Sequence, residues 1–174
     1  MSTDPADLSV IDLADRYGAR SLLPVEAVDA VFRRIKTHDP VVNAFVLHDE
    51  EAARASAGES EARWAKGEAI SPLDGVPTTI KDLLPVTGWP TRRGSTVSPD
   101  GPAEEDAPAV ARLKEAGAVL IGKTTTPEFG WKGITDSPLT GITRNPWNPE
   151  KTPGGSSGGA AAAAALGMGA VNIG

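Results

Sequence analysis

Two adjacent serines and one lysine are the residues of this 174-residue chain whose surroundings best suit proton-transfer chemistry. Ser156 and Ser157 lie between two pairs of glycines, directly before a run of alanines. Glycine allows backbone angles that other residues avoid, and it lets another segment or a ligand approach closely. Two serines held in such a loop could act as a nucleophile or a proton relay. Two simpler interpretations remain open, a flexible Gly/Ser linker and a pair of helix-capping serines.

Lys81 follows an apolar, β-branched segment, residues 76–80, that is typical of a buried strand. Burial disfavours the charged amine, so it lowers the pKa of a lysine and leaves more neutral amine to act as a base. Taken from position alone, however, the favoured interpretation is a structural ion pair with Asp82 or another carboxylate. Asp82 itself is interpreted as structural, because neighbouring strand residues point to opposite sides.

Four motifs together resemble one known family in their order and spacing. Residues 74–82, 115–124, 145–148 and 151–159 are similar to segments of the amidase signature family, and the resemblance runs from about Leu8 to the last residue. It implies an α/β fold with a mixed central sheet flanked by helices. It also implies hydrolysis of an amide bond by a Ser–cis-Ser–Lys triad through an acyl-enzyme.

The resemblance assigns expected roles to particular residues. Lys81 matches the catalytic lysine, and Ser156 matches the bridging serine that follows a cis peptide bond and relays a proton to Lys81. Ser157 is expected to cap the helix that begins near Gly158 or to bond within the loop, and it is also a substrate-binding candidate. The other substrate-binding candidates lie in the segment that borders the family's substrate cleft: Gly130, Trp131 and Gly133. Trp147 is expected to pack under the serine loop.

The helix after the serine loop is expected to present its N-terminal amides toward the same cleft, where they would favour developing negative charge. The nucleophile is not assigned to any residue of this chain. In the family it follows the strand after the alanine helix, and that strand here reaches Gly174. We therefore expect residues 1–174 to be the N-terminal part of a single amidase signature domain, incomplete in this chain. Residues 1–174 by themselves are expected to be inactive, because the nucleophile and the oxyanion hole would lie further on.

Charge and composition limit the classes of partner and cofactor that we expect. The net charge is −6, the pI is about 4.9 and the basic residues are scattered, which argues against a nucleic acid or an anionic membrane as partner. The chain has no cysteine, which excludes disulfides, thiolate metal sites and a cysteine nucleophile. His38 and His48 are too few for a metal site. No cofactor is expected, since residues 154–159 lack the Gly-Lys-Ser/Thr of a phosphate-binding loop.

The N-terminus lacks the pattern of a signal peptide, and no apolar run approaches membrane-spanning length, so a cytoplasmic protein is expected. Periodicity and punctuation predict helices alternating with short strands. Helices are expected near residues 10–17, capped by Ser9 or Asp7, from Pro24 onward, and over residues 49–67, 107–116 and 157–166. Strands are expected over residues 41–47, 76–80, 118–121 and 170–173.

Three functional interpretations follow. The first is an amidase acting on a small-molecule amide, for which the sequence does not identify the substrate. The second, within the same family, is the glutaminase-type subunit of a tRNA-dependent amidotransferase, which works in a complex. The third is a non-catalytic binding module that retains the serine loop. A homodimer is one candidate for the oligomeric state.

Overall fold

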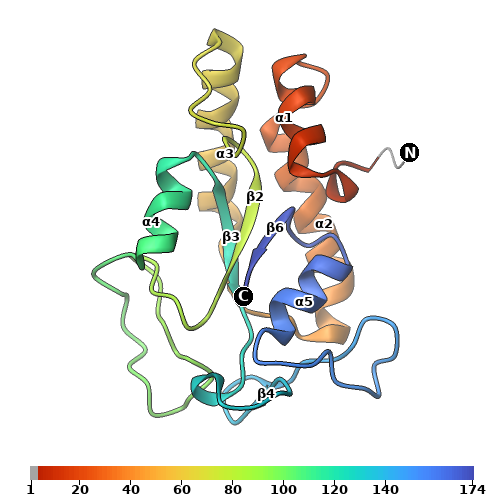
Figure 1. Ribbon diagram of the computed structural model, residues 1–174, viewed down its shortest axis with the longest axis vertical. Coiled ribbons are helices and arrows are strands. Elements are labelled where there is room, and N and C mark those ends of the chain that lie inside the picture. The colour runs from red at the N-terminus through yellow and green to blue at the C-terminus, as the bar shows by residue number, and fades with distance from the viewer. Residues whose placement is uncertain (1–3) are drawn as a thin grey trace.

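The computed structural model describes residues 4–174, and its helices and strands alternate along the chain (Figure 1). The helical segments are η1 (Pro5–Asp7), α1 (Val10–Gly18), α2 (Pro24–Val42), α3 (Glu50–Lys66), α4 (Pro108–Glu115), η2 (Glu128–Gly130) and α5 (Gly158–Ala165). The strands are β1 (Phe45–His48), β2 (Pro77–Lys81), β3 (Val119–Thr124), β4 (Asp136–Ser137), β5 (Gly141–Ile142) and β6 (Val171–Ile173).

Four of these strands form one mixed sheet in the order β1-β3-β2-β6. Strand β1 runs antiparallel to β3, whereas β2 is parallel to both β3 and β6. The short strands β4 and β5 pair separately as an antiparallel ribbon. The predicted α/β architecture with a mixed sheet flanked by helices is therefore confirmed.

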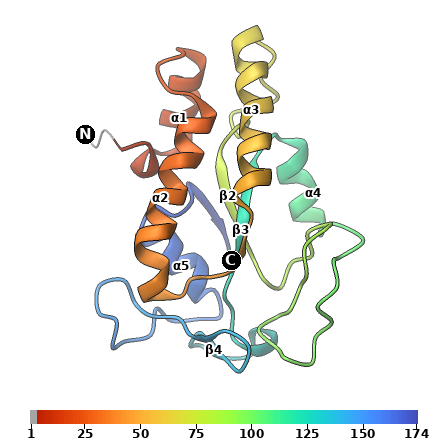
Figure 2. The ribbon, with the colours of Figure 1, turned by 180° about the vertical axis from the view of Figure 1, so that it is seen from behind.

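The two faces of the sheet are covered by different helices. Val119 and Ile121 of β3 pack into one core with α2, α3 and α5. Ile80 of β2 and Leu120 of β3 face the other way and pack with Val110 of α4. Figures 1 and 2 show α4 on one side of the strands and α2 with α5 on the other. Alternation along the strands thus places Lys81, next to Ile80, on the side of α5.

Helix starts follow the chemistry expected from the sequence. The Ser9 hydroxyl accepts a hydrogen bond from the Asp12 amide, and the Asp12 carboxylate accepts bonds from Ser9, which completes a capping box at α1. Pro24 begins α2, where its missing amide hydrogen costs nothing. Asp49 caps α3, and Gly67 ends it in the left-handed conformation.

The strand predicted over residues 41–47 is wrong at its start. Helix α2 continues through Pro40 to Val42, and β1 begins only at Phe45. The Asp39 carboxylate accepts hydrogen bonds from the amides of Ala44 and Phe45, just past the helix end. These bonds and the left-handed Asn43 turn the chain sharply, so the β-branched residues before them belong to the helix.

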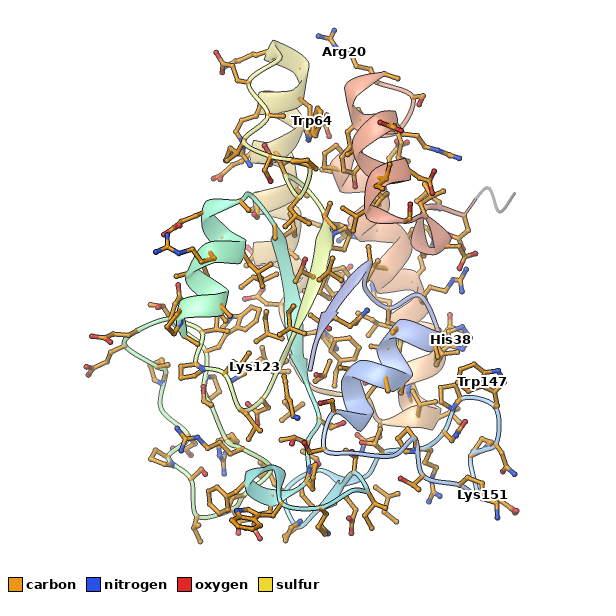
Figure 3. The ribbon with its side chains drawn as sticks, viewed as in Figure 1. Arg20, His38, Trp64, Lys123, Trp147 and Lys151 are labelled. Carbon is orange, nitrogen blue, oxygen red and sulfur yellow. The ribbon has the colours of Figure 1, made fainter. Side chains whose placement is uncertain are left out.

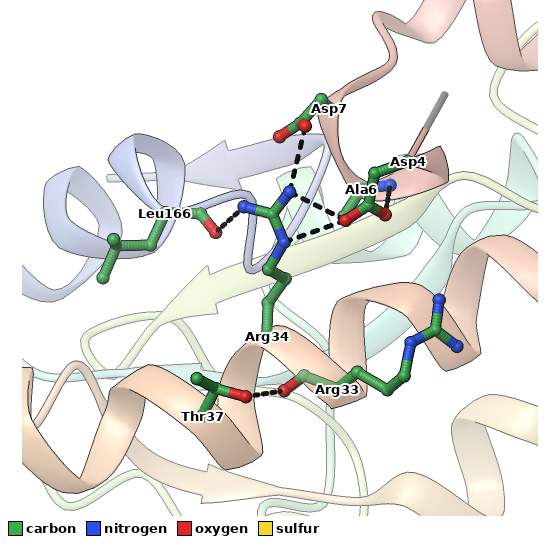
Figure 4. Close-up of polar contacts among 7 residues, drawn as sticks. All are labelled: Asp4, Ala6, Asp7, Arg33, Arg34, Thr37 and Leu166. Atoms are coloured by element: carbon green, nitrogen blue, oxygen red, sulfur yellow. Dashed lines mark hydrogen bonds and ion pairs between the residues drawn. The ribbon is translucent and has the colours of Figure 1, made fainter. Parts of the chain in front are cut away.

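An arginine of α2 ties the N-terminal segment to α5. The Arg34 guanidinium bonds the carboxylates of Asp4 and Asp7 at 2.8 and 2.9 Å, and it donates to the carbonyl of Leu166 at 3.4 Å (Figure 4). Leu166 is the C-cap residue directly after α5, so Arg34 joins the end of this helix to residues at the other end of the chain. None of the helices in residues 4–174 combines the length and apolar character needed to cross a membrane.

The position of α5 depends on glycine at its start. A Cβ atom at Gly159 would lie 2.4 Å from the Thr125 amide nitrogen and 2.6 Å from the Ala44 carbonyl oxygen. Both atoms belong to the backbone, so neither can move aside cheaply.

We predict that Gly159→Ala lowers the free energy of unfolding by about 1–3 kcal/mol, because the added methyl group overpacks α5 against this backbone. Urea denaturation of the complete protein measures the change. The matched control is Gly58→Ala in α3, where a Cβ atom meets nothing within 4 Å. That variant is expected to be neutral or more stable by up to about 1 kcal/mol. Equal effects of the two substitutions would contradict the packing argument.

Candidate active site

Lys81 and the two serines meet at the carboxyl end of β2. Lys81 ends this strand and is only 6% exposed. Its Nζ lies 2.8 Å from Oγ of Ser156 and 2.7 Å from Oγ of Ser157. A hydroxyl can donate or accept a hydrogen bond, so a neutral amine could bond both serines and still act as a proton acceptor. The structure thus brings together residues that are 75 and 76 positions apart in the chain.

Burial is the cause that lowers the pKa of Lys81 from its ordinary value. The alternative in which Lys81 pairs with Asp82 is wrong, because the Asp82 carboxylate pairs with Lys123 at 2.8 Å. The neighbours of the Lys81 amine are hydroxyls, which stabilise a positive charge less than a carboxylate does. In these surroundings, a larger fraction of the Lys81 amine is expected to be neutral than in an exposed lysine.

Close backbone approach shapes the serine loop. The peptide bond between Gly155 and Ser156 is cis, the geometry expected for the bridging serine. A Cβ atom at Gly155 would lie 2.8 Å from the backbone of Ile134, and one at Gly158 would lie 2.2 Å from the Thr135 hydroxyl. Glycine at these positions therefore lets the loop rest directly on residues 134 and 135.

Thr135 is a residue of this site that the sequence analysis did not single out. Its buried hydroxyl donates to the Gly154 carbonyl at 2.9 Å and accepts from the Gly158 amide at 3.0 Å. One side chain thus joins the two ends of the loop that carries both serines. The only hint in the sequence was its place in the segment already expected to border the cleft.

The expected helix cap at Ser157 is wrong. Ser157 occupies the N-cap position of α5, but its hydroxyl bonds Lys81 and makes no capping bond. The Thr135 hydroxyl accepts a hydrogen bond from Gly158, whose amide is the first of the helix. The first two helix amides already have acceptors within the protein, since the Gly158 amide donates to the Thr135 hydroxyl and the Gly159 amide to the Thr125 carbonyl.

The remaining candidates divide into two groups. Gly130 borders the serine loop, since a Cβ atom there would lie 3.9 Å from Oγ of Ser156. Gly174 lies against Ser157, because a Cβ atom at Gly174 would lie 2.9 Å from Oγ of Ser157. By contrast, Trp131 is 86% exposed, and a Cβ atom at Gly133 would meet nothing within 4 Å. Of the three substrate-binding candidates near residue 130, only Gly130 approaches Ser156.

Trp147 does not pack under the serine loop, so that expectation is wrong. Its side chain is 81% exposed and lies near the periphery, in the region of Lys151 (Figure 3). The Trp147 amide bonds the Asn145 side chain, and the Asn145 amide bonds the Lys151 carbonyl. The turn therefore closes on itself and leaves the indole outside.

Comparison with known proteins identifies the family. The model named Amidase matches residues 26–174, which is most of the chain. The chain belongs to the amidase signature family, as its motifs indicated.

Two curated relatives and one solved structure illustrate the likeness. The chain is 42% identical to an indoleacetamide hydrolase of Bradyrhizobium diazoefficiens, covering 94% of this chain and 31% of the relative. It is 43% identical to a glutamyl-tRNA(Gln) amidotransferase subunit of Roseiflexus sp., over 96% of this chain and 34% of that relative. A crystal structure of an amidase superposes with a TM-score of 0.86 at 39% identity, over 94% of this chain and 37% of the amidase chain. The chain thus spans about a third of the length of the relatives it matches.

The lowered pKa of Lys81 predicts how stability depends on pH. Between the lowered pKa and the ordinary value of 10.5, the unfolded chain holds a proton on Lys81 that the folded protein lacks. Raising the pH through this window therefore increases the free energy of unfolding.

We predict that this increase is smaller in Lys81→Met, because methionine does not titrate. Urea denaturation at several alkaline pH values measures it in both proteins. Lys123 is present in both, so the difference between the two curves isolates Lys81. A difference that stays constant across the alkaline range would show that the Lys81 pKa is not lowered.

Proposed function

We propose that the complete protein hydrolyses the amide bond of a small molecule by a Ser–cis-Ser–Lys mechanism. The observation that carries this proposal is the Lys81 amine, buried and within 2.8 Å of the Ser156 hydroxyl. Family membership supports the reaction class, since the matched relatives include an indoleacetamide hydrolase and an acylamidase.

The proposed steps conserve protons. Neutral Lys81 accepts the proton of Ser156 while Ser156 accepts that of the nucleophilic hydroxyl, whose oxygen forms a bond to the amide carbon. The tetrahedral intermediate then breaks its C–N bond, and the proton returns through Ser156 to the departing amine or ammonia. Water hydrolyses the remaining acyl-enzyme by the same relay. The nucleophilic hydroxyl is not assigned to any residue of this chain.

A second candidate is the glutaminase-type subunit of an amidotransferase. Identity of 43% to a glutamyl-tRNA(Gln) amidotransferase subunit favours it about as strongly as the amidase relatives favour the first candidate. The two differ in their need for a partner. Hydrolysis of simple amides by the purified complete protein supports an independent amidase, whereas ammonia release from glutamine only with a partner protein supports the alternative.

We predict that Lys81→Ala in the complete protein lowers kcat/KM for amide hydrolysis by at least about 100-fold, because the general base is lost. Ser156→Ala is expected to have a loss of similar order, since it interrupts the relay. Steady-state release of ammonia or amine measures both.

The matched control is Lys151→Ala, which removes an exposed lysine at the periphery (Figure 3). It is expected to keep the activity of the parent protein. Near-normal turnover by Lys81→Ala would refute the assigned base. If the parent protein shows no activity on amides or glutamine, with or without partner, a binding module is favoured.

A further inference from the structure

A second buried lysine lies at the same end of the sheet, in very different surroundings. Lys123 of β3 is fully buried among the loops at the sheet end (Figure 3). Its Nζ lies 2.8 Å from Oδ1 of Asp82, 2.9 Å from the Pro90 carbonyl and 2.8 Å from the Thr91 hydroxyl. An ammonium has three hydrogens to donate, and each of these finds an acceptor. The geometry is that of a cation held in place.

The carboxylate that faces Lys123 belongs to the residue directly after Lys81. Asp82 is 1% exposed, and its amide donates to the Thr124 carbonyl at 3.1 Å. Its carbonyl accepts from the Arg93 amide at 3.1 Å, and Oδ1 accepts from the Arg92 amide at 3.3 Å. Asp82 therefore anchors the end of β2 to β3 on one side and to the loop of residues 92–93 on the other.

We propose that the Asp82–Lys123 ion pair positions Lys81. The pair fixes the end of β2, and it cancels the charge of Asp82, the carboxylate nearest to Lys81 in the chain. The inference rests on the proposed role of Lys81 as the base. Lys123 and Asp82 are positioning residues here, since they act through Lys81.

The physical reason is electrostatic. An uncompensated carboxylate near a lysine favours the charged amine, and the interaction is stronger in a buried site than in water. Asp82 without Lys123 would therefore work against the burial that lowers the pKa of Lys81. Paired with Lys123, it presents a nearly neutral group to the amine.

Other ionisable groups lie on the elements around this end of the sheet. Helix α5 and strand β6, which pack beside Lys81, carry no ionisable side chain. Ionisable groups on other neighbouring segments include Arg92, Arg93, Glu128 and His48, and Lys132 and Asp136 beside the serine loop pair with each other. Helix α2, which also contacts β2, carries further ionisable residues. Glu128 accepts a hydrogen bond from the Ser95 hydroxyl. Burial is the largest cause that lowers the pKa of Lys123, Asp82 opposes this effect, and Arg93 adds to it. Asp82 is the carboxylate closest to Lys81 along the chain, and its ion-pair partner is Lys123.

The test is a pH titration of Lys81 followed by NMR in the complete protein labelled with ¹³C-lysine, with the Lys81 signal assigned from Lys81→Arg. In Lys123→Met, Asp82 is left unpaired, and the Lys81 signal is expected to titrate at higher pH. The neutral fraction near neutral pH then falls about tenfold. In Asp82→Asn, the Lys123 charge is uncompensated, and the Lys81 signal is expected to titrate at lower pH.

A purely structural role would not shift the Lys81 titration in opposite directions in the two variants. Loosening of the strand end would shift it in the same direction in both. The double variant Asp82→Asn/Lys123→Met is neutral and is expected to titrate close to the parent protein. Thr91→Val, which keeps the ion pair, serves as the control and is expected to leave the titration unchanged.

Shifts in the same direction, or no shift in either single variant, would overturn the proposal. If Lys123→Met does not fold, Asp82→Asn decides alone, and an unchanged or upward titration refutes the proposal. The titration requires no catalytic activity. Failure of the ion-pair proposal is therefore distinguishable from failure of the proposed function, which the Lys81→Ala assay tests separately.

Discussion

Backbone contact at three glycines is the constraint on which the rest of this site depends. Gly155, Gly158 and Gly159 rest on the backbone or side chains of residues 134, 135 and 125, with no room for a Cβ atom. Only when the serine loop lies directly on these residues can it reach the end of β2 and place two hydroxyls within 2.8 Å of the Lys81 amine. A larger side chain at any of these positions would move the loop away from the lysine.

The second determinant is electrostatic, and it separates two lysines that are both buried. Lys81 meets two hydroxyls, so nothing offsets the effect of burial on its pKa. Lys123 meets a carboxylate, a carbonyl and a hydroxyl, which together satisfy an ammonium. Burial lowers the pKa of both lysines, but only at Lys123 does a carboxylate, that of Asp82, oppose this effect. The difference lies in the partners that the loops bring, rather than in burial itself.

Prediction from the sequence succeeded where a residue's local chemistry decides its structure. Ser9, Pro24 and Gly67 marked helix ends correctly because caps and turns involve only near neighbours. It was wrong where a distant or competing group intervened. Asp39 captured the amides beyond α2 and shortened the expected strand, and Lys81 took the Ser157 hydroxyl that was expected to cap α5. Trp147 was misplaced because its turn closed on itself.

The sequence by itself determined the family, the alternation of helices and strands, and the lysine and serines with the chemistry of a base and a relay. These follow from residue types and spacing, which the chain carries without folding. Only the tertiary structure decided that Ser157 reaches Lys81, that Thr135 closes the serine loop and that Lys123 pairs with Asp82. Each of these contacts joins segments far apart in the chain, so sequence spacing contains no information on which side chain faces which.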